Sequence, residues 1–134
     1  MRCELCESDG GTLVWRGEQC RVVHVAEPGY AGYLRAIWNA HVREMTDLTE
    51  SERAGYMRVV FALEAALREL LRPDKVNLAS LGNATPHLHW HVIARFRDDP
   101  HFPNAVWGAP VRSPDLGKPP AEWLGTLAVT LSRL

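Results

Sequence analysis

Residues 87–93 restrict the fold more than any other stretch, because three histidines alternate there with large apolar side chains. The sequence reads His87-Leu88-His89-Trp90-His91-Val92-Ile93. Successive side chains of an extended strand point to opposite faces, so the imidazoles share one face and the apolar side chains share the other. On a helix, three residues spaced two apart would not share a face. The pattern predicts a strand over 87–94 with one core face and one chemically active face.

Length and charge limit the kinds of protein that this chain can be. Its 134 residues fit one domain, which buries roughly two-thirds of the surface of the unfolded chain. The net charge is −1, and no run of like charges suggests a nucleic-acid partner. No apolar segment approaches the ~20 residues of a membrane span, and the N-terminus lacks the apolar centre of a secretory signal. We expect one core, no membrane partner and a cytoplasmic location.

The N-terminal pair Cys3 and Cys6 has a spacing that is common in tetrahedral zinc sites. The chain has no second pair of this kind, so the remaining ligands would be histidines from distant positions, and His41 and His87 are the candidates. Reduced thiols, a zinc site and a redox dithiol all remain open, although no βαβ pattern accompanies the pair. An odd total of three cysteines without an export signal argues against a disulfide framework.

Alternation of apolar and polar residues predicts the other strands. The runs 12–16 and 20–26 flank a Gly-containing turn and predict a hairpin, in which we interpret His24 as structural. A third strand is expected over 32–38. A fourth, over 76–81, is followed by a loop that ends at Pro86, which we expect to be the first residue of the histidine strand.

Two helices are expected. Thr49-Glu50-Ser51-Glu52 matches a capping box, and apolar residues then recur every three or four positions until Pro73, which predicts a helix of about 49–72 over one face of the sheet. Residues 103–120 are rich in proline and predict an irregular arm that packs on the domain or on a second subunit. A final helix is expected from Ala121 to Leu131.

Three imidazoles on one strand face support two kinds of chemistry. In the first, a neutral imidazole attacks phosphorus while its neighbours donate hydrogen bonds to the phosphoryl oxygens. In the second, two of the histidines and a third ligand bind zinc and activate water. A merely structural set is disfavoured, because burying an unpaired imidazole costs a few kcal/mol. If the strands over 76–81 and 87–94 pair in antiparallel fashion, Asn77 and the loop amides lie toward the histidine face.

The histidine stretch and the features around it resemble those of a known protein family. Residues 87–93 match the signature of the histidine triad (HIT) proteins, in which histidine and an apolar residue alternate three times before a further apolar residue. From about residue 3 to residue 105 the order of the features resembles a bacterial HIT domain: the cysteine pair, the hairpin, a strand ending near His41, Asp47-Leu48 before a long helix, an Asn-bearing strand and a Gly-Asn loop. The resemblance implies an α+β fold with an antiparallel sheet of about five strands, and a homodimer. The HIT domain would span 1–105, and an arm and helix would follow over 106–134.

The resemblance also implies an activity. It suggests a hydrolase or transferase that cleaves a phosphorus bond in a small nucleotide conjugate, such as a nucleoside phosphoramidate or a dinucleoside polyphosphate, without a catalytic cofactor. His89 would be the nucleophile and would form a nucleotidyl-histidine intermediate, and His87 and His91 would hold the phosphate or orient the nucleophile. Asn77 and Asn83 would bind ribose or phosphate. The alternative is a metal-binding or non-catalytic nucleotide-binding module that uses the same histidines.

Three residues depart from the family pattern. Tyr33 stands where many members have a histidine, and Asn83 and Ala84 stand where a Gln and a hydroxyl residue are usual. Thr85 or the loop amides are therefore expected to supply the missing hydrogen bond to the substrate. Some members carry a structural zinc. In this chain its ligands would be Cys3, Cys6, His41 and His87.

Overall fold

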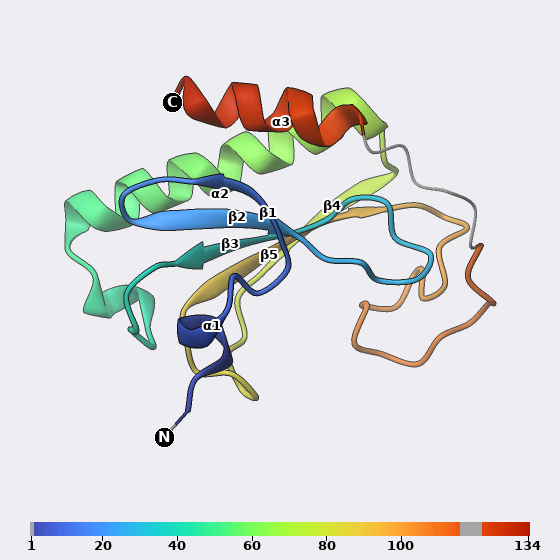
Figure 1. Cartoon of the computed structure of the whole chain (residues 1–134). Helices are drawn as coiled ribbons and strands as arrows, with labels where there is room; N and C mark the ends of the chain where they lie inside the picture. Colours follow the sequence, from blue (N-terminus) through green and yellow to red (C-terminus); the bar gives the residue numbers. More distant parts are fainter. Residues whose placement is uncertain (1, 116–121) are drawn as a thin grey trace.

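Five strands form one antiparallel sheet in the computed structural model, which describes residues 2–115 and 122–134 (Figure 1). In spatial order they are β1 (Thr12–Arg16), β2 (Cys20–His24), β3 (Tyr33–Trp38), β5 (His89–Arg95) and β4 (Lys75–Ala79). The helices are α1 (Glu4–Glu7), α2 (Glu50–Leu71) and α3 (Glu122–Ser132), with a 3-10 turn η1 (Met45–Asp47) before α2. The predicted α+β class with a five-stranded antiparallel sheet is confirmed.

Helix α2 begins at the predicted capping box. The Thr49 hydroxyl accepts a hydrogen bond from the Glu52 amide at 3.1 Å, and the Glu52 carboxylate accepts one from the Thr49 amide at 2.7 Å. Two amides that the first turn leaves unpaired are thereby satisfied. The helix ends at Leu71, and the residue that caps it, Arg72, has a left-handed backbone (φ 51°) and precedes Pro73. The predicted long helix is confirmed.

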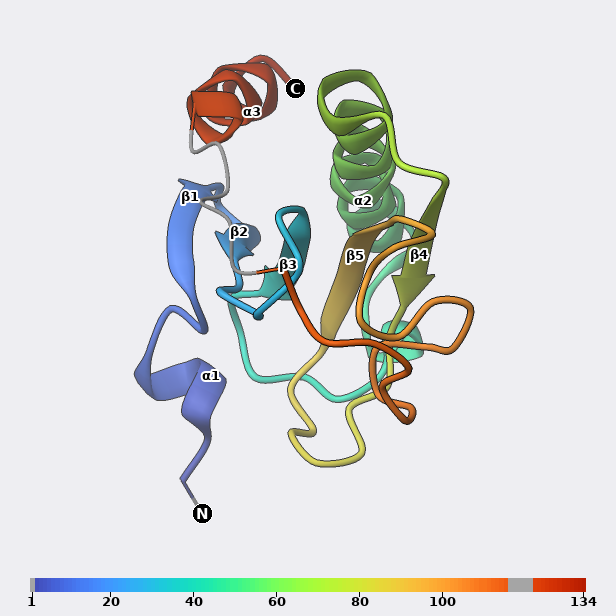
Figure 2. The same cartoon turned by 90° about the vertical axis from the view of Figure 1, so that its right-hand side faces the viewer.

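Helices α2 and α3 lie side by side on one face of the sheet (Figures 1 and 2). The main core fills the space between them and the sheet. From β5 it takes Val92, and from the residue before that strand it takes Leu88; both are buried, and Trp90 is partly buried against the same cluster. Trp123 and Leu127 of α3 complete this core. Full burial of each such side chain contributes about 1.5–3 kcal/mol, so the apolar half of the histidine stretch anchors the sheet to the helices.

The opposite face of the sheet carries α1, the loop before β5 and the arm of residues 96–115 (Figure 2). Leu5 of α1 packs on Val23 and Ile37 in a small second core. This contact holds the N-terminal segment against the sheet on the side of the histidines. The helices of residues 2–115 and 122–134 include none that is long and apolar enough to cross a membrane.

The predicted boundaries are wrong at several strand ends. β5 begins at His89, not at residue 87, because the His87 amide donates to the Thr85 carbonyl (2.8 Å) in a turn. Pro86 therefore belongs to the loop and does not open the strand.

Smaller shifts affect the other elements. β3 begins one residue after Gly32, β2 ends at His24, and β4 covers Lys75–Ala79 instead of 76–81. Ala121, the expected start of the last helix, lies outside the described residues, and α3 continues one residue past Leu131. The one-turn elements α1 and η1 were not predicted, since they are too short for a periodic signal.

Candidate active site and metal site

His89 and His91 project from β5 on the face away from α2. Their ring centroids are 4.9 Å apart in an edge-to-face arrangement, and both residues are buried. In the β3–β5 ladder, Ile37 lies opposite His89 and Arg35 lies opposite His91. Opposed residues of antiparallel strands point to the same side, so Arg35 shares the face of the two imidazoles.

The backbone fixes the tautomer of His89. Its Nδ1 lies 2.6 Å from the carbonyl oxygen of His87. A carbonyl can only accept, so Nδ1 carries the proton and Nε2 keeps its lone pair. Burial, partly offset by this hydrogen bond, lowers the pKa of His89 below its ordinary value. The ring is therefore neutral and presents a free nitrogen, as the predicted nucleophile requires.

His91 is held by two aromatic neighbours. The Tyr33 hydroxyl lies 3.3 Å from His91 Nδ1, and the Trp107 ring meets the imidazole edge-on with centroids 4.8 Å apart. Burial, followed by the charges of His89 and Arg35, lowers the pKa of His91 to about 3. Because the Tyr33 oxygen also accepts from the Arg35 guanidinium, its hydroxyl hydrogen is available to Nδ1, so the neutral His91 ring carries its proton on Nε2 and becomes a hydrogen-bond donor. Tyr33, the departure from the family pattern, thus supports the third histidine of the motif.

His87 does not join the other two rings. Its Nε2 donates to the Trp38 carbonyl at 2.6 Å, so its Nδ1 keeps a lone pair. That nitrogen lies 3.4 Å from Cys3 Sγ, 3.5 Å from Cys6 Sγ and 3.3 Å from His41 Nδ1. The structure therefore brings together the four residues that were predicted as zinc ligands. The three imidazoles therefore divide between two sites, because the ring of His87 is directed to the cysteines while His89 and His91 contact each other.

The spacing of these four side chains fits a zinc ion. Their ligand atoms all lie within 4.8 Å of one another. With the bond lengths of zinc, a tetrahedron places two nitrogens about 3.3 Å apart and a nitrogen and a sulfur about 3.6 Å apart. The observed nitrogen–nitrogen and nitrogen–sulfur separations, 3.3 Å and 3.4–3.5 Å, agree with both values.

Arg35 was not predicted as a site residue. Its Nη1 donates to the Gly10 carbonyl at 3.2 Å, whereas its Nε is buried and lacks a hydrogen-bond partner among the described residues. The guanidinium charge contributes to the lowered pKa of His89 and of His91. Its place on the histidine face follows from the strand register, which the sequence did not give.

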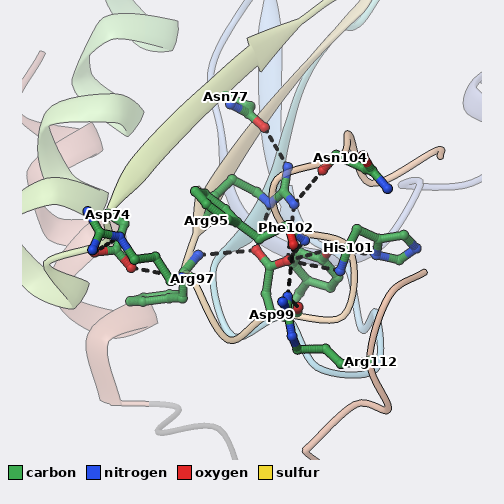
Figure 3. Close-up of polar contacts among 11 residues, drawn as sticks. Asp74, Asn77, Arg95, Arg97, Asp99, His101, Phe102, Asn104 and Arg112 are labelled. Atoms are coloured by element: carbon green, nitrogen blue, oxygen red, sulfur yellow. Dashed lines mark hydrogen bonds and ion pairs between the residues drawn. The ribbon is translucent and has the colours of Figure 1, made fainter. Parts of the chain in front are cut away.

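A second polar cluster anchors the arm beside the triad (Figure 3). Arg95 and Asp99 form a buried ion pair with Nε–Oδ2 at 2.7 Å and Nη2–Oδ1 at 3.0 Å. Arg95 Nη2 also donates to the Asn104 carbonyl at 2.8 Å. Asp99 accepts three backbone amides as well, those of Phe96, His101 and Phe102. This network fixes the chain that carries Trp107 to His91.

The residues predicted to bind the substrate lie in different surroundings. Asn77 lies on the histidine face, but its Oδ1 accepts from Arg95 Nη1 at 2.7 Å. Asn83 is exposed in the loop before β5, where Thr85 is partly buried. An open cavity of about 610 Å³ runs beside the site and is lined by Asn77, Ala79 and Trp107, among others. Since Ala79 lies opposite His91 in the sheet, this cavity adjoins the triad.

The model of the HIT domain family matches residues 9–98, about two-thirds of the chain. The chain belongs to the HIT family. In sequence this HIT protein is 28% identical over 107 residues to AP-4-A phosphorylase of Mycobacterium tuberculosis, a match that covers 75% of this chain and 55% of the relative. The chain thus spans about half the length of the curated relatives that it matches.

Solved structures of HIT proteins have the same fold. A histidine triad protein from Bradyrhizobium japonicum superposes with a TM-score of 0.76 at 28% identity, covering 99% of this chain and 95% of the other. A histidine triad protein from Sinorhizobium meliloti superposes with a TM-score of 0.71 at 26% sequence identity, covering 99% of this chain and 95% of the other. A zinc-bound histidine triad family protein from Mycobacterium smegmatis superposes with a TM-score of 0.69 at 22% identity, covering 99% of this chain and 97% of the other. The homodimer and the division of this HIT protein near residue 105 stay predictions.

Proposed function

We propose that this HIT protein is a nucleotide-phosphate hydrolase or transferase with His89 as the nucleophile. The observation that carries the proposal is the 2.6 Å hydrogen bond from His89 Nδ1 to the His87 carbonyl, which leaves Nε2 unprotonated. A preorganised nucleophile of this kind needs no separate base.

The reaction takes two steps. His89 Nε2 attacks phosphorus, the bond to the leaving group breaks, and the nucleotidyl group remains on His89 while the leaving group takes up a proton from solvent. Water, or another acceptor of the nucleotidyl group, then attacks the phosphorus and releases its proton to solvent, and the bond to Nε2 breaks and restores the neutral ring. His91 Nε2–H donates to the phosphoryl oxygens during both steps, and the amides near Thr85 supply further donors.

The relative named AP-4-A phosphorylase favours a dinucleoside polyphosphate as the substrate over a phosphoramidate. The open cavity beside His91, with half-exposed Trp107 on its wall, offers room for the nucleoside of the attacked phosphate. Exposed aromatic rings are common platforms for bases. Asn77, Asn83 and Thr85 remain candidates for contacts with ribose or phosphate.

The intermediate provides the direct test. We expect brief incubation with a dinucleoside polyphosphate, followed by rapid quenching, to add one nucleotidyl group to a peptide that contains His89. Mass spectrometry of the digest locates the adduct. Attachment to His91 or to another residue would contradict the assignment of the nucleophile.

We further propose that Cys3, Cys6, His41 and His87 hold a structural zinc. All four ligands come from the protein, which leaves no open position for water and distinguishes such a site from a catalytic one. The ion would tie the N-terminal segment to the residue whose carbonyl orients His89. This arrangement also supports the alternative function, a metal-binding or non-catalytic nucleotide-binding module that uses the same histidines, and the adduct experiment distinguishes the two.

Removing a ligand tests the metal site. We expect the purified protein to contain one zinc ion per chain by elemental analysis, and Cys6→Ser to lose most of it. With free zinc at a thousand times the dissociation constant, binding adds about 4 kcal/mol of stability, so the variant should melt roughly 10 °C lower. Cys20→Ala, which removes the thiol buried in the main core, is the control and should keep the zinc. Equal zinc content in Cys6→Ser and the unmodified protein would contradict the site.

A further inference from the structure

Arg35 is a charged side chain without a counter-charge. Its Nε is buried without a partner among the described residues, and its other hydrogen-bond acceptors are neutral groups, the Gly10 carbonyl and the Tyr33 hydroxyl. Across residues 2–115 and 122–134, no carboxylate forms an ion pair with it. Arg95, on the same face, is paired with Asp99 and also donates to Asn77 and to the Asn104 carbonyl. Of these two guanidinium groups, only that of Arg35 lacks a counter-charge among the described residues.

An unpaired buried donor costs a protein stability, and a partly buried charge costs more. Such a group does not stabilise the folded state, so its role is better explained by binding. A ligand with a negative charge would supply the missing partner. Guanidinium is charged at every accessible pH, and its planar donors match phosphate oxygens. The position opposite His91 places this group at the edge of the site where His89 acts.

The direction of the side chain shows which phosphate it reaches. Arg35 extends to the Gly10 carbonyl, in the turn between α1 and β1, and so lies to one side of the two imidazoles. The phosphorus that His89 attacks must sit at Nε2 of that ring, where His91 is the neighbouring imidazole and the proposed donor. The guanidinium is therefore placed for the next group along the substrate.

We propose that Arg35 binds a second phosphate of the substrate, next to the one that His89 attacks, and so selects nucleotides with a polyphosphate chain. The inference rests on the proposed function, because it takes His89 as the point of attack. It separates two substrate classes, since a phosphoramidate has no second phosphate. Arg35 acts in binding and specificity and does not take part in bond cleavage.

Binding of two nucleotide probes tests the assignment without turnover. Affinities for adenosine 5′-monophosphate and 5′-diphosphate are measured by calorimetry, in the absence of magnesium, for the unmodified protein and for Arg35→Met. A hydrogen bond to a charged group corresponds to a factor of about 10 to 150 in affinity, so the unmodified protein should prefer the diphosphate by at least about tenfold. Arg35→Met should abolish that preference and leave the affinity for the monophosphate within about threefold.

Two further variants serve as controls. Arg58→Met removes an equal charge from the exposed face of α2, on the other side of the sheet, and should keep the preference for the diphosphate. Arg35→Lys keeps the positive charge but lacks the planar arrangement of donors, and should keep part of the preference for the diphosphate. Because Arg35 has no counter-charge, Arg35→Met should melt no lower than the unmodified protein.

Retention of the diphosphate preference in Arg35→Met would overturn the proposal. A decrease of the affinities for the monophosphate and the diphosphate by the same factor would overturn it too, because Arg35 would then act on the attacked phosphate or on the fold. Failure of the proposed function is a different result, namely no adduct at His89, and it leaves these affinities interpretable.

Discussion

Replacing His89 with alanine is expected to lower kcat/KM for a dinucleoside polyphosphate by on the order of 10⁴-fold or more. The variant lacks the nitrogen that the His87 carbonyl keeps unprotonated next to His91, so water would have to attack the substrate directly. Because the lost ring interacts with the substrate mainly as a nucleophile, kcat should fall far more than the affinity for nucleotide. Steady-state rates together with calorimetric affinities measure both effects.

His24→Ala is the matched control for this variant. His24 is a partly buried histidine at the end of β2, whose Nε2 donates to the Ala31 carbonyl at 2.9 Å and whose ring meets Trp123 edge-on. It lies apart from the triad, and its loss should leave kcat within about twofold. Turnover by His89→Ala at a rate close to that of the control would show that phosphorus is attacked by another group, and the metal-binding alternative would then gain support.

Replacing Asp99 with alanine is expected to lower the free energy of unfolding by about 3–5 kcal/mol, because it leaves the buried Arg95 guanidinium without its partner. That is a large part of the roughly 5–15 kcal/mol that stabilises a domain of this kind. The variant also loses the acceptor for three backbone amides, so the arm that places Trp107 on His91 should loosen. Denaturant unfolding measures the loss, and Asp98→Ala is the control, since its carboxylate is exposed next to Asp99 in the same turn. A loss below about 1 kcal/mol in Asp99→Ala would contradict a structural role for the ion pair.

The pH dependence gives an independent check on Asp99. Burial alone raises the pKa of this carboxyl, but the hydrogen bonds from Arg95 and from the three amides outweigh it and hold the pKa at about 2, below the ordinary 3.8. The carboxylate therefore stabilises the fold fully above about pH 4, and this contribution is lost as the pH falls toward 2. A depression of this size corresponds to about 2 kcal/mol. The unmodified protein should lose that much more stability between pH 4 and pH 2 than Asp99→Asn does.

Local patterns in the sequence were sufficient for most of the architecture. The alternation of residues 89–93 and the capping box at Thr49 depend on neighbours within one strand or one turn, and both appear in the structure as predicted. The family resemblance supplied the expectation of an antiparallel sheet of about five strands and supported the four metal-ligand candidates already named from the residues. The strand and the helix start could be found because each is encoded in a short, continuous segment.

Contacts between distant segments decided the rest. Cys3 and His87, 84 residues apart, meet where Leu5 packs on β2 and β3, and this contact assigns His87 to the cysteines while His89 and His91 stay together. The strand register places Arg35 opposite His91 and Val23, where no carboxylate among the described residues pairs with it, and no single segment encodes that register. The sequence alone therefore determined which chemistry is present, since residue type and periodicity are local properties. Only the tertiary structure decided which of these groups share a site, because the pairing of strands and the packing of α1 set the distances between them.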